Sequence, residues 1–158
     1  MKSFIKSVGY ALRGIYYAAW ERNFRIDIVA ATLVIWFSVI YNLTSAEWTA
    51  EILIIATVLS SEAVNTAIET LCDRISKENE EKIKRIKDLA AGAVLIKAVA
   101  AIAAAIFLFK DSDRLLNALS EFSSPPRMIV LIIFIVLSAI FIFAPERAKA
   151  RKKEVNKK

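Results

Sequence analysis

Histidine is absent from the sequence, and cysteine occurs once, at Cys72. Without histidine the chain has neither the common zinc motifs nor histidine-based acid–base catalysis. A single cysteine rules out an intrachain disulfide and suits a reduced or membrane-buried setting. The chemistry that remains available rests on carboxylates, an amide and nearby lysines and arginines.

Glycine and proline are scarce as well, with 3 residues of each. Few turns are available, and this favours helices over a β-barrel. The glycines Gly9, Gly14 and Gly92 are isolated, so neither a Walker loop nor a Rossmann phosphate-binding loop can be built. No serine nucleophile elbow or cysteine–histidine pair is present either.

Apolar residues, in contrast, are abundant. They make up 57% of the chain, the mean hydropathy is +0.49, and the charged 24% is segregated between apolar runs. This pattern is typical of an integral membrane protein with short loops. We predict an all-α membrane helical bundle with an amphipathic surface helix at 3–20. Membrane spans are expected at about 26–43, 50–72 and 89–109, with a polar linker at 111–127, a fourth span at 128–144 and a basic tail at 145–158.

The basic residues indicate how the chain crosses the membrane. They concentrate before the first predicted span, between the second and third, and after the fourth, whereas the first outer loop has none. The positive-inside rule therefore predicts that both termini are cytoplasmic. Because the charges lie next to apolar runs, the net charge of +6 indicates contact with lipid headgroups instead of nucleic acid.

One stretch, residues 62–74 at the end of the second predicted span, combines apolar and acidic residues. At about 100° per residue, its acidic and amide side chains fall within one narrow stripe of a helix. The stripe consists of Glu62, Asn65, Glu69 and Asp73. Ionisable groups at membrane depth are costly and commonly face a bundle interior or a wet site.

Three interpretations of this acidic stripe are possible. A solvated face of a soluble helix is disfavoured because the opposite faces are too apolar for water. The stripe could instead supply hydrogen bonds between transmembrane helices. The third interpretation is an active site, since carboxylates with a few cations suit Mg²⁺ and a polyphosphate, and phosphoryl transfer needs little else. A non-catalytic membrane protein or an ion transporter is the competing hypothesis from another functional class.

Several separated motifs follow one another along the chain. They are Gly9-Tyr10, Gly14 and the segment 21–25, then Glu62, Asn65, Ala67, Glu69, Asp73 and Arg74, and then Lys87-Asp88 and the segment 90–96. In their order and spacing these motifs resemble the small prokaryotic diacylglycerol kinase / undecaprenol kinase family. The resemblance covers about residues 3–109.

The resemblance implies a homotrimeric membrane enzyme whose kinase domain spans residues 1–110, with three transmembrane helices and a surface helix per subunit. Such an enzyme transfers the γ-phosphate of MgATP to a lipid alcohol, at active sites shared between subunits. It implies that Glu62 is the catalytic base, that Glu21 and Glu69 bind the metal, and that Glu62, Arg25 and Trp20 contact the lipid substrate. The implied ATP contacts are Tyr10, Glu21, Asn65, Glu69, Asp73, Glu78, Asn79, Glu80, Lys87 and Asp88.

Two features bear on substrate and architecture. The segments 21–25 and 90–96 look more like the undecaprenol kinase branch, so undecaprenol is the expected acceptor and diacylglycerol the alternative. The fourth apolar run lies outside the three-helix pattern, so removal of the chain after about residue 113 is expected to leave activity largely intact. Lys97, inside the third span, either snorkels to the interface or pairs with a carboxylate such as Glu69. The resemblance implies location in the bacterial cytoplasmic (inner) membrane.

Overall fold

The structure is a computed structural model that describes residues 2–75 and 80–145. The described chain is entirely helical and contains no strand, which confirms the predicted all-α class. Its helices are α1 (Lys2–Ala18), α2 (Arg22–Tyr41), α3 (Ser45–Ile75), α4 (Glu81–Leu108), α5 (Ser112–Phe122) and α6 (Pro125–Phe143).

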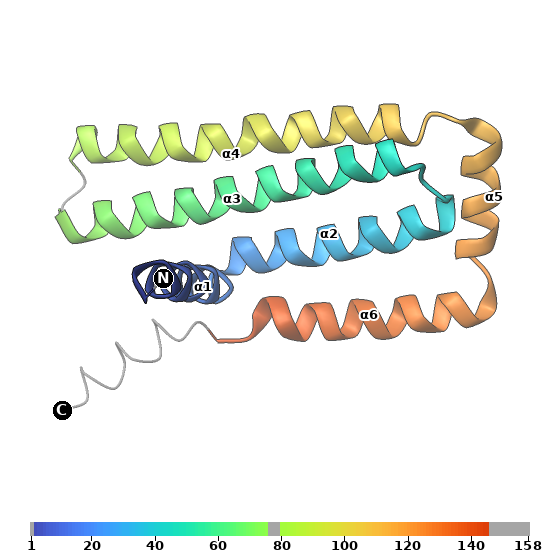
Figure 1. Ribbon diagram of the computed structural model, residues 1–158, viewed down its shortest axis with the longest axis horizontal. Helices are drawn as coiled ribbons and strands as arrows, with labels where there is room; N and C mark the ends of the chain where they lie inside the picture. The colour runs from blue at the N-terminus through green and yellow to red at the C-terminus, as the bar shows by residue number, and fades with distance from the viewer. Residues whose placement is uncertain (1, 76–79, 146–158) are drawn as a thin grey trace.

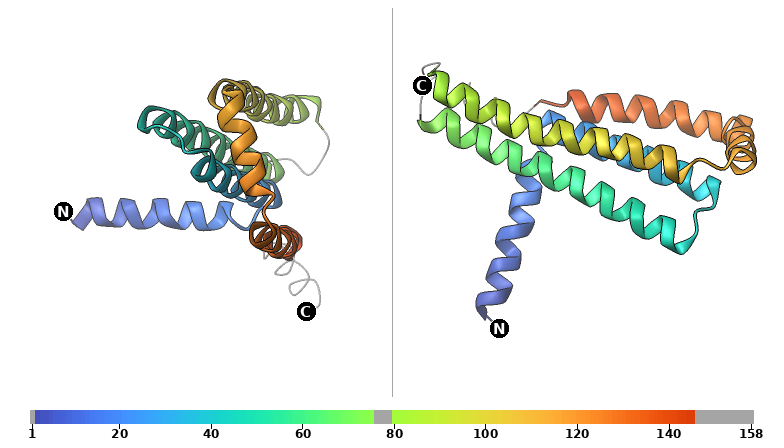
Figure 2. Two further views of the ribbon diagram at one scale, coloured as in Figure 1. Left: turned by 90° about the vertical axis from the view of Figure 1, so that its right-hand side faces the viewer. Right: turned by 90° about the horizontal axis from the view of Figure 1, so that it is seen from above.

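Four of these helices, α2, α3, α4 and α6, are long and apolar enough to cross a membrane. They run side by side along the long axis of the molecule, each antiparallel to the one before it (Figure 1). α1 projects across that axis at the end where α2 begins, as a helix lying on a membrane surface would (Figure 2). Most large apolar side chains of the bundle are exposed, and in a bilayer they face lipid tails instead of water.

Two of the spanning helices, α3 and α4, are longer than the hydrocarbon layer is thick. α3 has 31 residues, which is about 46 Å of helix against a layer of about 30 Å. It begins directly after a tight connection in which Asn42 adopts a left-handed conformation and donates its N–H to the carbonyl of Ser38. The excess length lets the acidic end of α3 extend beyond the hydrocarbon into the headgroup region.

The segment 111–127, expected to be a polar linker, contains the helix α5. Its start is capped by the Asp111 carboxylate, which accepts hydrogen bonds from the backbone N–H groups of Asp113 and Arg114, at 3.1 and 3.0 Å. α5 lies across the end of the bundle opposite to α1 and connects α4 with α6 (Figure 1).

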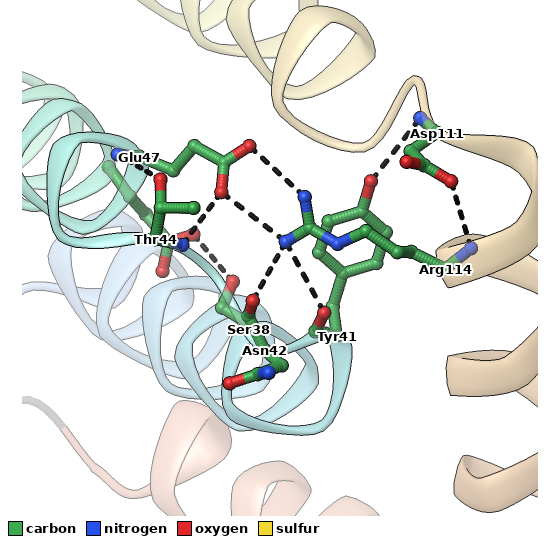
Figure 3. A network of polar contacts seen from close by, with 8 residues as sticks. Ser38, Tyr41, Asn42, Thr44, Glu47, Asp111 and Arg114 are labelled. Atoms are coloured by element: carbon green, nitrogen blue, oxygen red, sulfur yellow. Dashed lines mark hydrogen bonds and ion pairs between the residues drawn. The ribbon is translucent and has the colours of Figure 1, made fainter.

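A polar network attaches α5 to the connection between α2 and α3 (Figure 3). The Arg114 guanidinium donates to the carbonyl of Asn42 at 2.8 Å, pairs with Glu47 at 3.3 Å, and lies 4.2 Å from the centre of the Tyr41 ring. The hydrogen bond to Glu47 raises the pKa of Arg114. This network joins the start of α5 to the connection between α2 and α3, at the end of the bundle opposite to the acidic stripe (Figure 1). Its role is therefore structural.

Candidate functional site

An acidic cleft lies where the start of α2 meets the second half of α3. Its volume is about 180 Å³. It is lined by Glu21, Arg22 and Asn23 from the start of α2 and by Glu62, Thr66 and Glu69 from α3. The structure therefore brings together the three glutamates to which the resemblance gave the roles of catalytic base and metal ligands, from segments about forty residues apart.

The geometry of α3 explains half of this arrangement. Glu62 and Glu69 are seven residues apart, so they share one face of the helix and lie about 10 Å apart along its axis. The stripe changes from buried to exposed along α3: Glu62 and Asn65 are 4% and 5% exposed, Glu69 is half-buried, and Asp73 is exposed. The cleft thus runs from a protected carboxylate inside the bundle to an open end.

The start of α2 supplies the rest of the cleft. Glu21 precedes the first turn of α2 in extended conformation, and its carbonyl accepts the backbone N–H of Arg25 at 3.1 Å. The N-terminal end of a helix carries unsatisfied N–H groups and partial positive charge, which favour phosphate groups. The cleft therefore combines carboxylates, which attract cations, with a helix end that attracts anions.

Hydrogen bonds orient the buried side chains of the cleft. Asn23 lines the cleft together with Glu62, and Glu21 and Glu69 line the same cleft. Asn65 donates from Nδ2 to Glu69 Oε1 at 2.9 Å. Its own Oδ1 is buried and has no hydrogen-bond partner among the described residues. Such an orphaned acceptor indicates that a donor from outside the described chain belongs to the site.

The donor set of the cleft fits a magnesium ion bound together with substrate phosphates. Within residues 2–75 and 80–145, no three acidic or cysteine side chains stand close enough to enclose a metal ion by themselves. Magnesium bound with a nucleotide needs only one or two protein carboxylates, because phosphates and water complete its octahedron. Glu21 and Glu69, at the open part of the cleft, match this requirement.

A second polar contact extends the site toward α4. Lys87 forms an ion pair with Asp73 and so joins the ends of α3 and α4. Asp88 follows Lys87 on α4, and Glu80 immediately precedes that helix. These four predicted ATP contacts lie at the same end of the bundle as the cleft. Two further predicted contacts, Glu78 and Asn79, lie outside the described residues.

Three other predicted residues lie elsewhere. Tyr10 is 64% exposed on α1, and within one chain it stands on the part of the molecule that projects from the bundle (Figure 2). Trp20 is half-buried in the turn after α1, with its ring against Tyr16. Arg25, predicted to contact lipid, is buried at 2% exposure, and its guanidinium donates to backbone carbonyls.

The structure adds cleft residues that the sequence did not identify. Asn23, Arg22 and Thr66 line the cleft, although no role was predicted for any of them. Two signals could have found them. Asn23 and Arg22 belong to the 21–25 motif itself, and Thr66 follows Glu62 by four residues, which places it on the same face of the helix.

Lys97 does not pair with the acidic stripe. It lines a small cavity between α3 and α4 with Leu53, Thr57 and Ala101, several turns away from Glu69. Among the described residues no ion pair joins it to Glu69. Of the two alternatives open from the sequence, a lysine that extends along the apolar surface toward the interface agrees with this position.

Several known proteins are similar to the larger part of this chain. Residues 9–109 match the family described as prokaryotic diacylglycerol kinase. An undecaprenol kinase of Bacillus subtilis is 36% identical over 110 residues, which cover 69% of this chain and 89% of that protein. Diacylglycerol kinases of Synechocystis and Escherichia coli K12 are 37% and 34% identical over 98 and 100 residues, covering 61% and 62% of this chain and 56% and 81% of those proteins. No solved structure is similar enough to count as a match.

Proposed function

The chain belongs to the prokaryotic diacylglycerol kinase family and is a multi-pass membrane lipid kinase that uses ATP, and from this premise we propose that it phosphorylates undecaprenol with MgATP. The observation that carries the proposal is the convergence of Glu21, Glu62 and Glu69 on one cleft. A non-catalytic or transporter role is set aside because the matched relatives are kinases.

The protected end of the cleft suits proton transfer. Glu62 would accept the proton of the lipid hydroxyl as it attacks the γ-phosphate, and Asn23, which lines the same cleft, would help to hold the carboxylate in place. Because Glu62 lies about two helical turns deeper than Glu69, a hydroxyl arriving from the bilayer meets the base before it meets the nucleotide.

The open end of the cleft suits the nucleotide. Glu21 and Glu69 would hold Mg²⁺, which would neutralise negative charge on the phosphate groups during transfer. Asn65 orients Glu69 through its hydrogen bond of 2.9 Å. Asp73 and Lys87, whose ion pair joins α3 to α4, are proposed to contact the nucleotide with Asp88, Glu80 and the segment at 78–79. Tyr10 on α1 is the remaining proposed ATP contact.

Undecaprenol is favoured as acceptor by the alignment with the Bacillus subtilis enzyme. That alignment spans 110 residues, against 98 and 100 for the two diacylglycerol kinases. The motifs at 21–25 and 90–96 support the same choice. Diacylglycerol is the alternative acceptor, since the percentage identities themselves are nearly equal.

Purified protein incubated with labelled ATP, Mg²⁺ and a panel of lipid alcohols tests the function. We expect the label in undecaprenyl phosphate. Label in phosphatidic acid would show instead that the acceptor is diacylglycerol, and the absence of any labelled lipid would refute the kinase proposal.

The oligomeric state is tested separately. The same preparation, sized by light scattering in detergent, tests the proposed homotrimer with shared active sites, and a mass equal to one chain would contradict it.

Both termini are proposed to lie in the cytoplasm, with the chain in the bacterial inner membrane. Four spans are an even number of crossings, which places both termini on the same side of the membrane. The acidic cleft lies at the end of the bundle where α1 meets the start of α2, and this is the end that must meet ATP. Reporter fusions after Lys158 should be active on the cytoplasmic side. A periplasmic signal from the same fusion would mean that α6 does not cross the membrane.

A further inference from the structure

Arg25 joins two parts of the chain that are far apart in sequence. Its guanidinium donates to the carbonyls of Phe141 and Ala144 at the end of α6, at 2.7 and 2.8 Å. It also donates to the carbonyl of Trp20, in the turn between α1 and α2, at 2.6 Å. The side chain is 2% exposed, so these bonds form away from solvent. A single buried cation therefore holds the end of α6 against the turn that precedes α2.

The end of α6 is well suited to receive a cation. The last carbonyls of a helix have no partner within the helix, and that end carries partial negative charge. α6 ends at Phe143, and the residue that follows it, Ala144, is not in a left-handed conformation, so the terminal carbonyls remain available to a side chain. A buried guanidinium is costly unless hydrogen-bonded. Here Nη1 and Nη2 of Arg25 donate to three backbone carbonyls, while its Nε is buried without a hydrogen-bond partner among the described residues.

Two contacts between arginines and aromatic rings link the same two segments, and one of them, between Arg22 and Phe143, does not involve Arg25. The Arg22 guanidinium lies 4.9 Å from the centre of the Phe143 ring, and that of Arg25 lies 5.8 Å from the centre of the Phe141 ring. Both distances fall within the range of cation–π attraction. Two aromatic rings on the last turn of α6 thus receive two arginines from the first turn of α2.

These contacts hold the turn from which the α2 side of the cleft begins. The carbonyl bound by Arg25 belongs to Trp20, which immediately precedes Glu21. The turn is closed by backbone bonds from Glu21 N–H to the Ala18 carbonyl at 2.9 Å and from Arg25 N–H to the Glu21 carbonyl at 3.1 Å. Glu21, Arg22 and Asn23 all line the cleft. Fixing this turn therefore fixes the α2 side of the site.

We propose that Arg25 is a positioning residue for the kinase reaction: anchored on the last turn of α6, it holds the 19–23 turn so that Glu21 and Asn23 face Glu62. The proposal rests on the proposed function. It gives α6, which lies outside residues 9–109, a role in the site. It also replaces the lipid contact expected for Arg25 from the sequence with an action on the nucleotide side of the cleft.

Kinetics of Arg25→Gln in the full chain, compared with Arg127→Gln, test the proposal. Arg127 is a matched control because it lies at the other end of α6, and among the described residues its hydrogen bonds, at 2.9 Å, go only to Glu121, far from the cleft. We expect Arg25→Gln to lower kcat/KM for MgATP by about 10–100-fold, since small displacements of site residues are costly, with the KM for the lipid unchanged. Arg127→Gln should stay within about twofold of wild type. Arg25→Lys should fall between them because an ammonium lacks the planar fork.

Hydrogen exchange gives a readout that needs no kinase activity. Backbone amides at 19–23 should exchange faster in Arg25→Gln and at the wild-type rate in Arg127→Gln. If the wild type phosphorylates no lipid, the proposed function fails, and the exchange data still test the contact. A raised KM for the lipid with unchanged exchange would show that Arg25 binds lipid and would overturn the proposal.

Milder variants keep the test decisive if Arg25→Gln does not fold. Phe143→Leu removes the ring beneath Arg22 and keeps an apolar side chain of similar size at the end of α6. It should speed exchange at 19–23 and weaken MgATP use in the same direction as Arg25→Lys, by a smaller factor. Wild-type exchange and wild-type MgATP kinetics in both of these variants would overturn the proposal.

Discussion

Replacing Glu62 with glutamine should lower kcat by a factor on the order of 10²–10⁴ with little change in the KM for MgATP. Glutamine preserves the shape and the polarity of the side chain, but it cannot accept a proton from the lipid hydroxyl. Because Glu62 lies at the protected end of the cleft, its loss should leave nucleotide binding almost untouched. Steady-state kinetics with MgATP and lipid varied separately measure both effects.

Glu51→Gln is the matched control for this variant. Glu51 is also a carboxylate of α3 and is 2% exposed, but it accepts a hydrogen bond from Ser38 of α2 and does not line the cleft. It should keep turnover close to wild type. Both variants must elute as the wild-type oligomer in detergent, which excludes a collapse of the bundle. Near-normal turnover of Glu62→Gln would mean that another group takes the proton.

The helices and the acidic stripe were predictable because they depend on local pattern. Long apolar runs bounded by charges determine where α2, α3, α4 and α6 lie, and a spacing of three and four residues places Glu62, Asn65 and Glu69 on one face. Glu21 is different, because no periodicity connects it with α3. Only the family resemblance joined it to the site, and the packing of α2 against α3 brings it there.

The elements that escaped prediction depend on contacts between distant segments. α5 has only 11 residues and a polar surface, so its sequence is typical of a linker, and it is fixed by Arg114 and the capping Asp111. The bond between Arg25 and α6 spans more than a hundred residues. Since α6 was treated as separate from the kinase domain, its removal was expected to leave activity largely intact. The contacts of Arg25 instead predict that such a truncation impairs use of MgATP.

The nucleotide side of the cleft should respond differently from Glu62 to the same substitution. Glu69→Gln and Glu21→Gln should each raise the KM for MgATP by about tenfold or more, because each would remove one of the few carboxylates that hold Mg²⁺. Excess Mg²⁺ should restore part of the lost activity, since a weakened site fills at higher metal concentration. The same excess should do nothing for Glu62→Gln, whose defect is in proton transfer.

Kinetics at several concentrations of free Mg²⁺, with ATP held constant, separate these outcomes. Glu121→Gln is a suitable control, because Glu121 pairs with Arg127 near the opposite end of the bundle and should show no dependence on added Mg²⁺ beyond that of wild type. Asn65→Ala removes the hydrogen bond that orients Glu69, so it should shift the Mg²⁺ requirement in the same direction as Glu69→Gln. If Glu69→Gln and Glu21→Gln lose turnover at every Mg²⁺ concentration while the KM for MgATP stays at the wild-type value, these carboxylates do not hold the metal. They would then act on the transferred phosphoryl group or on the proton, as Glu62 is proposed to do.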